Sequence, residues 1–106
     1  MGDEIIALIT ASSKDEAARI GTALVEERLA ACVNIVPEIR SLFFWEGKAQ
    51  DEREALLIVK SRQPLLGRLV SRVKTLHSYS VPEVIALPVV GGSREYLDWL
   101  NETTAE

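Results

Sequence analysis

One cysteine and one histidine are the strongest metal-binding side chains in this 106-residue sequence. A thiolate such as that of Cys32 is a soft ligand that suits Cu(I), whereas an imidazole such as that of His77 suits Cu(II). These two side chains cannot supply the four ligands of a Cys/His zinc site within one chain. A metal site must therefore also use carboxylates or ligands from several copies of the chain. The predicted metal ligands are Cys32, His77 and Glu83.

Cys32 and His77 also have structural interpretations. Free cysteine is among the most buried residue types, so Cys32 could be a small apolar side chain of a strand. His77 follows Val73 by four residues, which places it near the end of a predicted helix, where an imidazole can bind the last carbonyl groups. For both residues the metal and the structural interpretations stay open.

Lys60 has an unusual position for a charged residue. In a predicted strand its side chain shares a face with the apolar Leu56 and Ile58, where an ammonium group needs an ion partner or an exit to water. Glu46 and Glu83 are the predicted partners. This arrangement is either an ion pair at a subunit interface or part of a pocket for a small anion or metabolite.

Composition and motifs argue against several classes of function. The net charge of −4 is unfavourable for nucleic-acid binding. The sequence has no glycine-rich phosphate loop and no recognisable nucleophile motif with His77, so we do not expect an enzyme. No apolar run approaches the ~20 residues that span a bilayer. Because the chain starts with acidic residues and has a single thiol, the expected location is the cytoplasm, without a membrane partner.

The spacing of apolar residues predicts four strands and three helices. Apolar residues that recur every three or four positions indicate helices, and short runs rich in β-branched residues indicate strands. Ser12 or Ser13 is expected to cap the first helix together with an acidic residue three positions on. The polar run 48–53 after Gly47 is expected to form the loop of a long hairpin. Strands are predicted at 5–9, 31–36 with 39–45, 55–60 and 84–90, and helices at about 13–28, at 64–77 and after Ser93.

This order of elements predicts an α+β fold. It matches the split βαβ sandwich of ferredoxin-like folds, with an antiparallel sheet in the order 4-1-3-2 and an added short C-terminal helix, as one domain over residues 1–106. Proline cannot donate to a strand ladder, so strands that contain it belong at sheet edges. Pro37 and Pro88 fall in the two strands that this order places at the edges.

The predicted sheet has more apolar surface than its own helices can cover. Helices lie on one face only, yet three of the strands are apolar on both faces. The aromatic cluster 43–45 on an edge hairpin would also expose a larger patch than monomers usually tolerate. A symmetric homo-oligomer would cover these surfaces.

Several segments together resemble one known family. The sequence AACVNIVP at 30–37, WEGK at 45–48 and YSVPEVIALP at 79–88 closely resemble the CutA family of divalent-cation tolerance proteins, and the likeness runs from about residue 5 to 101. The resemblance implies a tight homotrimer that binds divalent cations, notably copper, and contributes to metal tolerance. Some copper-binding members carry an additional His and Cys where this chain has Leu76 and Ile9.

The resemblance also implies where a subunit pocket would lie. The corresponding loops of the family converge near subunit boundaries, and the predicted interface pocket consists of Trp45, Glu46, Lys60, Tyr79 and Glu83. Two alternatives to a metal-tolerance protein remain. One is a signalling module like the trimeric PII proteins, which bind small ligands or nucleotides between subunits. The other is an enzyme that uses Lys60, Tyr79 and Glu83 in the interface pocket.

Overall fold

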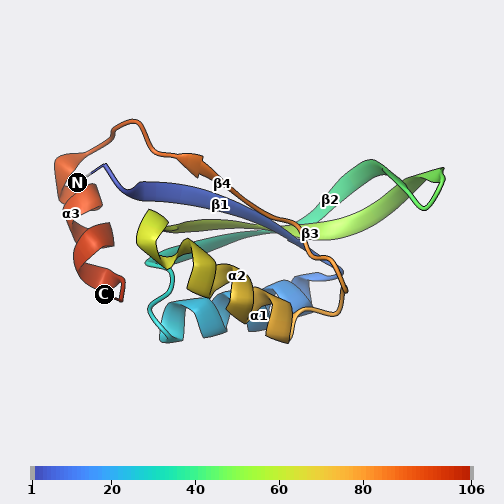
Figure 1. Cartoon of the computed structure of the whole chain (residues 1–106), viewed down its shortest axis with the longest axis horizontal. Coiled ribbons are helices and arrows are strands. Elements are labelled where there is room, and N and C mark those ends of the chain that lie inside the picture. The colour runs from blue at the N-terminus through green and yellow to red at the C-terminus, as the bar shows by residue number, and fades with distance from the viewer. Residues whose placement is uncertain (1, 106) are drawn as a thin grey trace.

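The computed structural model describes residues 2–105, which form a four-stranded sheet with helices on one face and a projecting hairpin (Figure 1). Helices α1 and α2 cover one face of the sheet, and α3 lies at the end of the sheet near the N-terminus. The molecule measures 44 × 25 × 22 Å because the β2–β3 hairpin extends beyond the helices. The elements are β1 (Glu4–Ala11), α1 (Lys14–Glu26), β2 (Cys32–Trp45), β3 (Lys48–Arg62), a 3₁₀ turn (Gln63–Leu65), α2 (Leu66–Leu76), β4 (Val84–Pro88) and α3 (Arg94–Thr103).

The sheet order is β2-β3-β1-β4 and all three pairings are antiparallel, which confirms the predicted α+β fold and its strand order. The strands that contain Pro37 and Pro88 are indeed the two edges. The pairing of β2 with β3 shifts register between Val36 and Ile39, so Pro37 lies at an irregularity where a ladder hydrogen bond is not needed.

The core lies between the sheet and the two helices α1 and α2. Helix α1 begins where predicted, because the Ser13 hydroxyl accepts a hydrogen bond from the Glu16 backbone N–H at 3.1 Å. Gly21 allows α1 to approach the sheet closely, since a Cβ atom there would lie 3.1 Å from Val33 Cγ1. The central buried side chains are Ala7, Ile9, Ile20, Leu24, Leu57, Val59, Leu69 and Val73.

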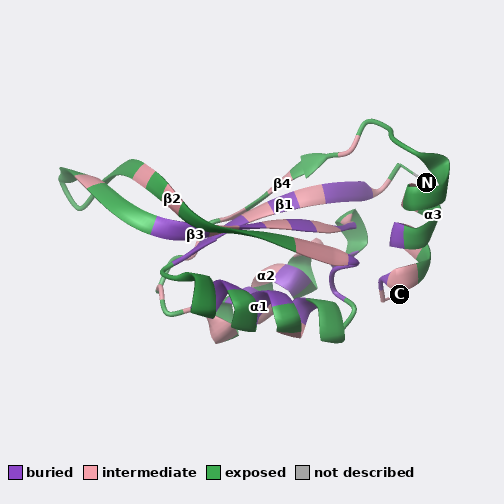
Figure 2. Ribbon diagram, turned by 180° about the vertical axis from the view of Figure 1, so that it is seen from behind, coloured by how far each residue is buried: buried purple, intermediate pink, exposed green. Residues whose placement is uncertain are grey.

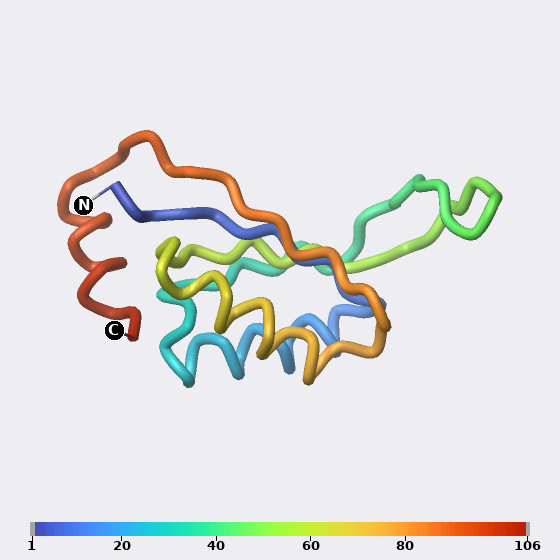
Figure 3. The backbone as a smooth tube through the Cα atoms, viewed as in Figure 1, coloured from blue at the N-terminus to red at the C-terminus, as the bar shows by residue number. Residues whose placement is uncertain are grey.

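The long β2–β3 hairpin differs from the sequence prediction. Residues 48–53 were expected to be a loop, but they are paired strand, and only Glu46 and Gly47 form the turn, with φ of 50° and 83°. The run is polar because this part of the hairpin, the arm, projects into solvent (Figure 3), not because it lacks structure. Two exposed cross-strand ion pairs lie along the arm: Arg40–Asp51 at 2.7 Å and Arg53–Glu38 at 2.6 Å.

Helix α3 is fastened to the body by arginine side chains. Ser93 caps the helix by accepting a hydrogen bond from the Tyr96 backbone N–H, and Arg28 Nε donates a hydrogen bond to the Thr103 carbonyl oxygen at 2.7 Å. Arg62 Nε donates to Thr104 Oγ1 at 2.7 Å. None of the helices in residues 2–105 combines the length and apolar character needed to cross a membrane.

Candidate functional site

An acidic pocket lies where the arm meets the segment between α2 and β4. Its cavity measures about 580 Å³. Four carboxylates line it, and neither lysine nor arginine is among the lining residues. Aromatic rings form part of the wall. The carboxylates belong to Glu46, Glu52, Glu54 and Glu83, and the rings to Phe43, Trp45 and Tyr79.

Strand β3 positions the most buried of these carboxylates. Glu54 pairs with Ile39 just beyond the register shift of β2, and only 8% of its surface is exposed. The Tyr79 hydroxyl donates a hydrogen bond to Glu54 Oε2 at 2.7 Å. Burial raises the pKa of the Tyr79 hydroxyl, and the hydrogen bond to Glu54 and nearby negative charges raise it further. Tyr79 therefore remains a neutral donor to Glu54.

The negative charge in the pocket is not balanced by basic side chains. Burial raises the pKa of the Glu83 carboxyl, and the charge of Glu54 raises it further. None of the ion pairs among residues 2–105 involves a carboxylate of the pocket. A cation in this cavity would reduce the repulsion between the carboxylates.

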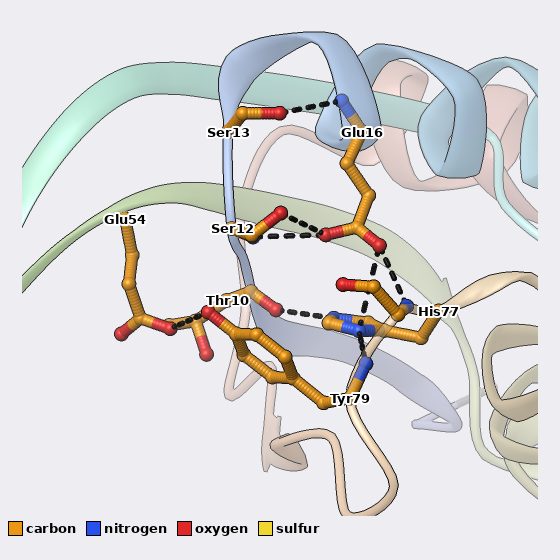
Figure 4. A network of polar contacts seen from close by, with 8 residues as sticks. Thr10, Ser12, Ser13, Glu16, Glu54, His77 and Tyr79 are labelled. Atoms are coloured by element: carbon orange, nitrogen blue, oxygen red, sulfur yellow. Dashed lines mark hydrogen bonds and ion pairs between the residues drawn. The ribbon is translucent and has the colours of Figure 1, made fainter.

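His77 holds the loop that carries Tyr79. The imidazole side chain is fully buried, and its ring centroid lies 4.6 Å from that of Tyr79. Nδ1 accepts a hydrogen bond from the Tyr79 backbone N–H at 3.0 Å, so Nε2 carries the proton and donates to the Thr10 carbonyl oxygen at 2.7 Å (Figure 4). Both ring nitrogens are thus engaged within the chain, which favours the structural interpretation of His77.

A buried carboxylate completes this network on the side of α1. Glu16 accepts hydrogen bonds from Ser12 N at 2.9 Å, Ser12 Oγ at 2.8 Å and Ser78 N at 2.7 Å (Figure 4). Burial raises the pKa of Glu16, but these hydrogen bonds outweigh it and lower the pKa to about 2. Glu16 Oε2 lies 3.8 Å from His77 Nδ1. The ionised Glu16 therefore ties the start of α1 to the loop after α2.

Lys60 lies in a different part of the sheet from the pocket. It is six residues from Glu54 along β3, a separation of about 20 Å at the rise of a strand. Lys60 faces Cys32 on β2, with Nζ 4.0 Å from Sγ, and it donates a hydrogen bond to the side-chain oxygen of Asn34. The prediction that Lys60 joins the pocket is therefore not met within one chain. The other four predicted pocket residues, Trp45, Glu46, Tyr79 and Glu83, do line the cavity.

The predicted metal ligands do not meet within one chain either. Cys32 lies opposite Lys60 of β3. His77 contacts Thr10, which lies opposite Leu56 of β3. Lys60 and Leu56 are about 13 Å apart along the strand. Glu83 lies in the acidic pocket. No group of three His, Cys, Asp or Glu side chains in residues 2–105 is arranged to hold a metal ion. A site that uses all three ligands would need neighbouring subunits, and it stays a prediction.

Sequence reasoning missed Glu16, Glu52 and Glu54 as functional candidates. Glu16 was expected only as a helix-capping residue, Glu52 was in the polar run 48–53 that was expected to be a loop, and Glu54 fell between that run and the predicted strand 55–60. An available signal was the position of Glu54, directly before the apolar segment 55–59 of a central strand. A carboxylate at the start of such a segment is partly buried and needs a partner.

Comparisons with known proteins agree with this fold and site. The family model described as CutA1 divalent ion tolerance protein matches residues 5–103, and the chain belongs to this family. The divalent-cation tolerance protein CutA of Thermus thermophilus is 52% identical over 95% of this chain and 98% of its own length. Its solved structure superposes with a TM-score of 0.94 and covers 96% of this chain and 99% of that chain.

Two less similar proteins also match nearly the whole of this chain. The rice protein CutA 1, chloroplastic, is 49% identical to this chain. The matched region covers 96% of this chain and 58% of the rice protein. The structure titled periplasmic divalent cation tolerance protein CutA from Archaeoglobus fulgidus has 44% identity and a TM-score of 0.91, and it covers 94% of this chain and 97% of that chain.

Proposed function

We propose that this protein is a homotrimer that binds divalent cations, copper among them, and contributes to the tolerance of metal ions. The observation that carries the proposal is the acidic pocket, which gathers four carboxylates and no basic side chain. Family membership supports a role connected with divalent cations. The role proposed is binding and not catalysis.

The chemistry of the pocket determines how a divalent cation would be held. Carboxylate oxygens are ligands for hard divalent cations, and burial together with the nearby charge of Glu54 raises the pKa of Glu83. The carboxylates of one subunit do not converge on a single point. A cation would therefore retain part of its water shell and bind weakly, unless a neighbouring subunit adds a ligand such as Cys32.

The exposed apolar surface supports the trimer. Phe44 on the arm is 73% exposed, and Ile85 on the edge strand β4 is 54% exposed. Figure 2 shows that the arm and β4 are mostly exposed, in contrast to the strands at the centre of the sheet. A monomer rarely leaves such apolar surface in water, and packing of subunits through the sheet and the arms would cover it.

The same pocket disfavours the alternative of a nucleotide-binding signalling module. Phosphate groups are anionic and bind where lysine, arginine or backbone N–H groups converge, whereas this cavity is lined by carboxylates. We propose a cytoplasmic location, supported by the single free thiol of Cys32. Cell fractionation tests the location, since the Archaeoglobus relative is titled periplasmic.

Light scattering and calorimetry test the two parts of the proposal. A mass of about 35 kDa, three times the 11.7 kDa of one chain, is expected in solution, and a mass of one chain would contradict the trimer. Titration with Mn²⁺ and Cu²⁺ should show binding that is weakened at least ten-fold in the double variant Glu54→Gln/Glu83→Gln. The matched control is Glu26→Gln, an exposed glutamate of α1.

Two further variants test the other predicted ligands. If Cys32→Ser or His77→Asn abolishes Cu²⁺ binding while Glu54→Gln/Glu83→Gln does not, the metal site lies at those residues and the pocket is not the site. Unchanged Cu²⁺ binding in both removes Cys32 and His77 from the set of ligands.

A further inference from the structure

We infer that the acidic pocket binds an organic cation, specifically a diamine or polyamine whose ammonium groups are joined by an apolar chain. The inference rests on the proposed cation site and extends its ligands from metal ions to organic cations. It is carried by the size of the cavity, the aromatic rings of its wall, the separate elements that supply its carboxylates and an available oxygen of a buried carboxylate.

The size of the cavity suits a small molecule better than a single ion. At about 580 Å³ the cavity falls within the range of roughly 300–1,000 Å³ typical of small-molecule sites. A metal ion with its first water shell would leave most of this volume filled with solvent. A chain of several methylene groups would instead displace water from the wall.

The wall combines aromatic rings with negative charge. Phe43 and Trp45 come from β2 of the arm, and Tyr79 comes from the segment after α2. The negative face of an aromatic ring attracts a positive ammonium group, and its apolar body packs against methylene groups. The carboxylates alone would attract any cation, whereas the rings favour one with an apolar part.

The carboxylates are spread around the cavity. No three acidic side chains of residues 2–105 converge closely enough to hold one metal ion. Glu46 follows β2 at the hairpin turn, Glu54 is on β3, and Glu83 precedes β4. Carboxylates that come from separate elements suit a ligand that carries more than one ammonium group.

Glu54 has an oxygen available for a ligand. Nine-tenths of this residue is buried, and its Oε2 accepts the hydrogen bond from the Tyr79 hydroxyl. The other oxygen, Oε1, accepts no hydrogen bond. In the described part of the chain every fully buried side-chain oxygen has a hydrogen-bond partner, so Oε1 is not fully buried and is open to the cavity. An ammonium group donating to Oε1 would form a charge-assisted hydrogen bond in a partly desolvated site.

Calorimetry with putrescine and spermidine on the full-length protein tests the inference, with the neutral 1,4-butanediol as the control ligand. We expect both amines to bind and the diol not to bind. Glu54→Gln should weaken amine binding at least ten-fold, because the amide cannot pair with an ammonium group as a carboxylate does. Trp45→Leu should weaken it at least three-fold, while the exposed Glu26→Gln should leave it unchanged.

A fluorescence experiment localises the ligand. In a Trp99→Phe background Trp45 is the only tryptophan, so saturable quenching by putrescine reports on the pocket itself. If Glu54→Gln does not fold, as judged by circular dichroism, Glu83→Gln takes its place with the same expected loss. Competition between putrescine and Mn²⁺ is expected, because both would occupy the same cavity.

The outcomes separate this inference from the proposed function. Binding of metal ions without amines overturns the inference and leaves the proposed function intact. Amine binding that Glu54→Gln and Glu83→Gln leave unchanged also overturns the inference, because the site then lies elsewhere. Absence of both metal and amine binding overturns both proposals. This result is expected if a basic side chain of a neighbouring subunit, such as its Lys60, fills the pocket. Amine binding that depends on the pocket, without metal binding, supports the inference alone.

Discussion

Replacing Glu16 with glutamine would isolate the contribution of one buried negative charge to stability. The variant keeps the size and shape of the side chain. However, Glu16 accepts hydrogen bonds on both oxygens, from Ser12 on one and from the Ser78 N–H on the other. A glutamine has one oxygen and an NH₂ group, so at least one donor of the protein would face another donor.

The magnitude follows from the pKa of Glu16. A folded-state pKa of about 2, against an ordinary value of 4.5, corresponds to at most about 3 kcal/mol of stability at pH 7. Hydrogen bonds to charged groups contribute about 1.5–3 kcal/mol each when one partner is removed, which agrees in size. We therefore expect Glu16→Gln to lower the free energy of unfolding by about 2–3 kcal/mol at pH 7.

The dependence on pH has a defined direction. Because folding lowers the pKa of Glu16, its contribution is complete above about pH 4.5 and disappears as the pH falls from 4.5 towards 2. The difference between the wild type and Glu16→Gln should shrink over that window. Urea denaturation at pH 7, 5 and 3, at one fixed protein concentration, measures it.

The control and the refuting result are equally specific. Glu26→Gln removes an exposed carboxylate from the same helix and should change stability by less than about 0.5 kcal/mol. If Glu16→Gln matches this control at pH 7, or if its difference from the wild type does not shrink between pH 5 and pH 3, then Glu16 is not the stabilising charge that its contacts indicate.

Two further predictions concern the backbone. The buried Ser61 hydroxyl donates to the Leu29 carbonyl oxygen at 2.6 Å, so Ser61→Ala should lower the free energy of unfolding by about 1–2 kcal/mol in urea denaturation. The exposed Ser71→Ala is its control, and an equal effect in both would contradict this role. Gly47 lies in the turn of the arm with φ of 83°, a backbone conformation that costs a residue with a side chain about 1–2 kcal/mol. Gly47→Val should therefore reduce hydrogen-exchange protection across the β2–β3 turn about ten-fold. Unchanged exchange at the Lys48 amide would show that the turn tolerates the side chain.

Much of the fold could be predicted from local features of the chain. Pro37 and Pro88 indicated the edge strands because proline lacks an N–H group whatever the surroundings. Ser13 and Ser93 capped their helices for the same kind of local reason. The exposed arm was harder to predict. Its polar residues 48–53 have the composition of a loop, and only pairing with β2 makes them a strand.

The candidate site was predictable only in part. Within one chain Trp45, Glu46, Tyr79 and Glu83 line the same cavity, whereas Lys60 lies near Cys32, so the predicted pocket between subunits stays a prediction. The expectation of an anion pocket depended on that lysine. Within one chain the cavity lacks that lysine and is lined by carboxylates, which favours a cation as the ligand.

The sequence by itself determined the order of elements, the strands that lie at the edges, the capped helices and the apolar surfaces that call for partners. These properties depend on residue type and on spacing of a few positions, which physical chemistry translates directly into local structure. Only the tertiary structure decided that Glu54 shares one cavity with Glu46, Glu83 and Tyr79. That decision depends on strand register and on the path of the loop after α2, and a shift of one residue along β3 would turn Glu54 to the other face of the sheet.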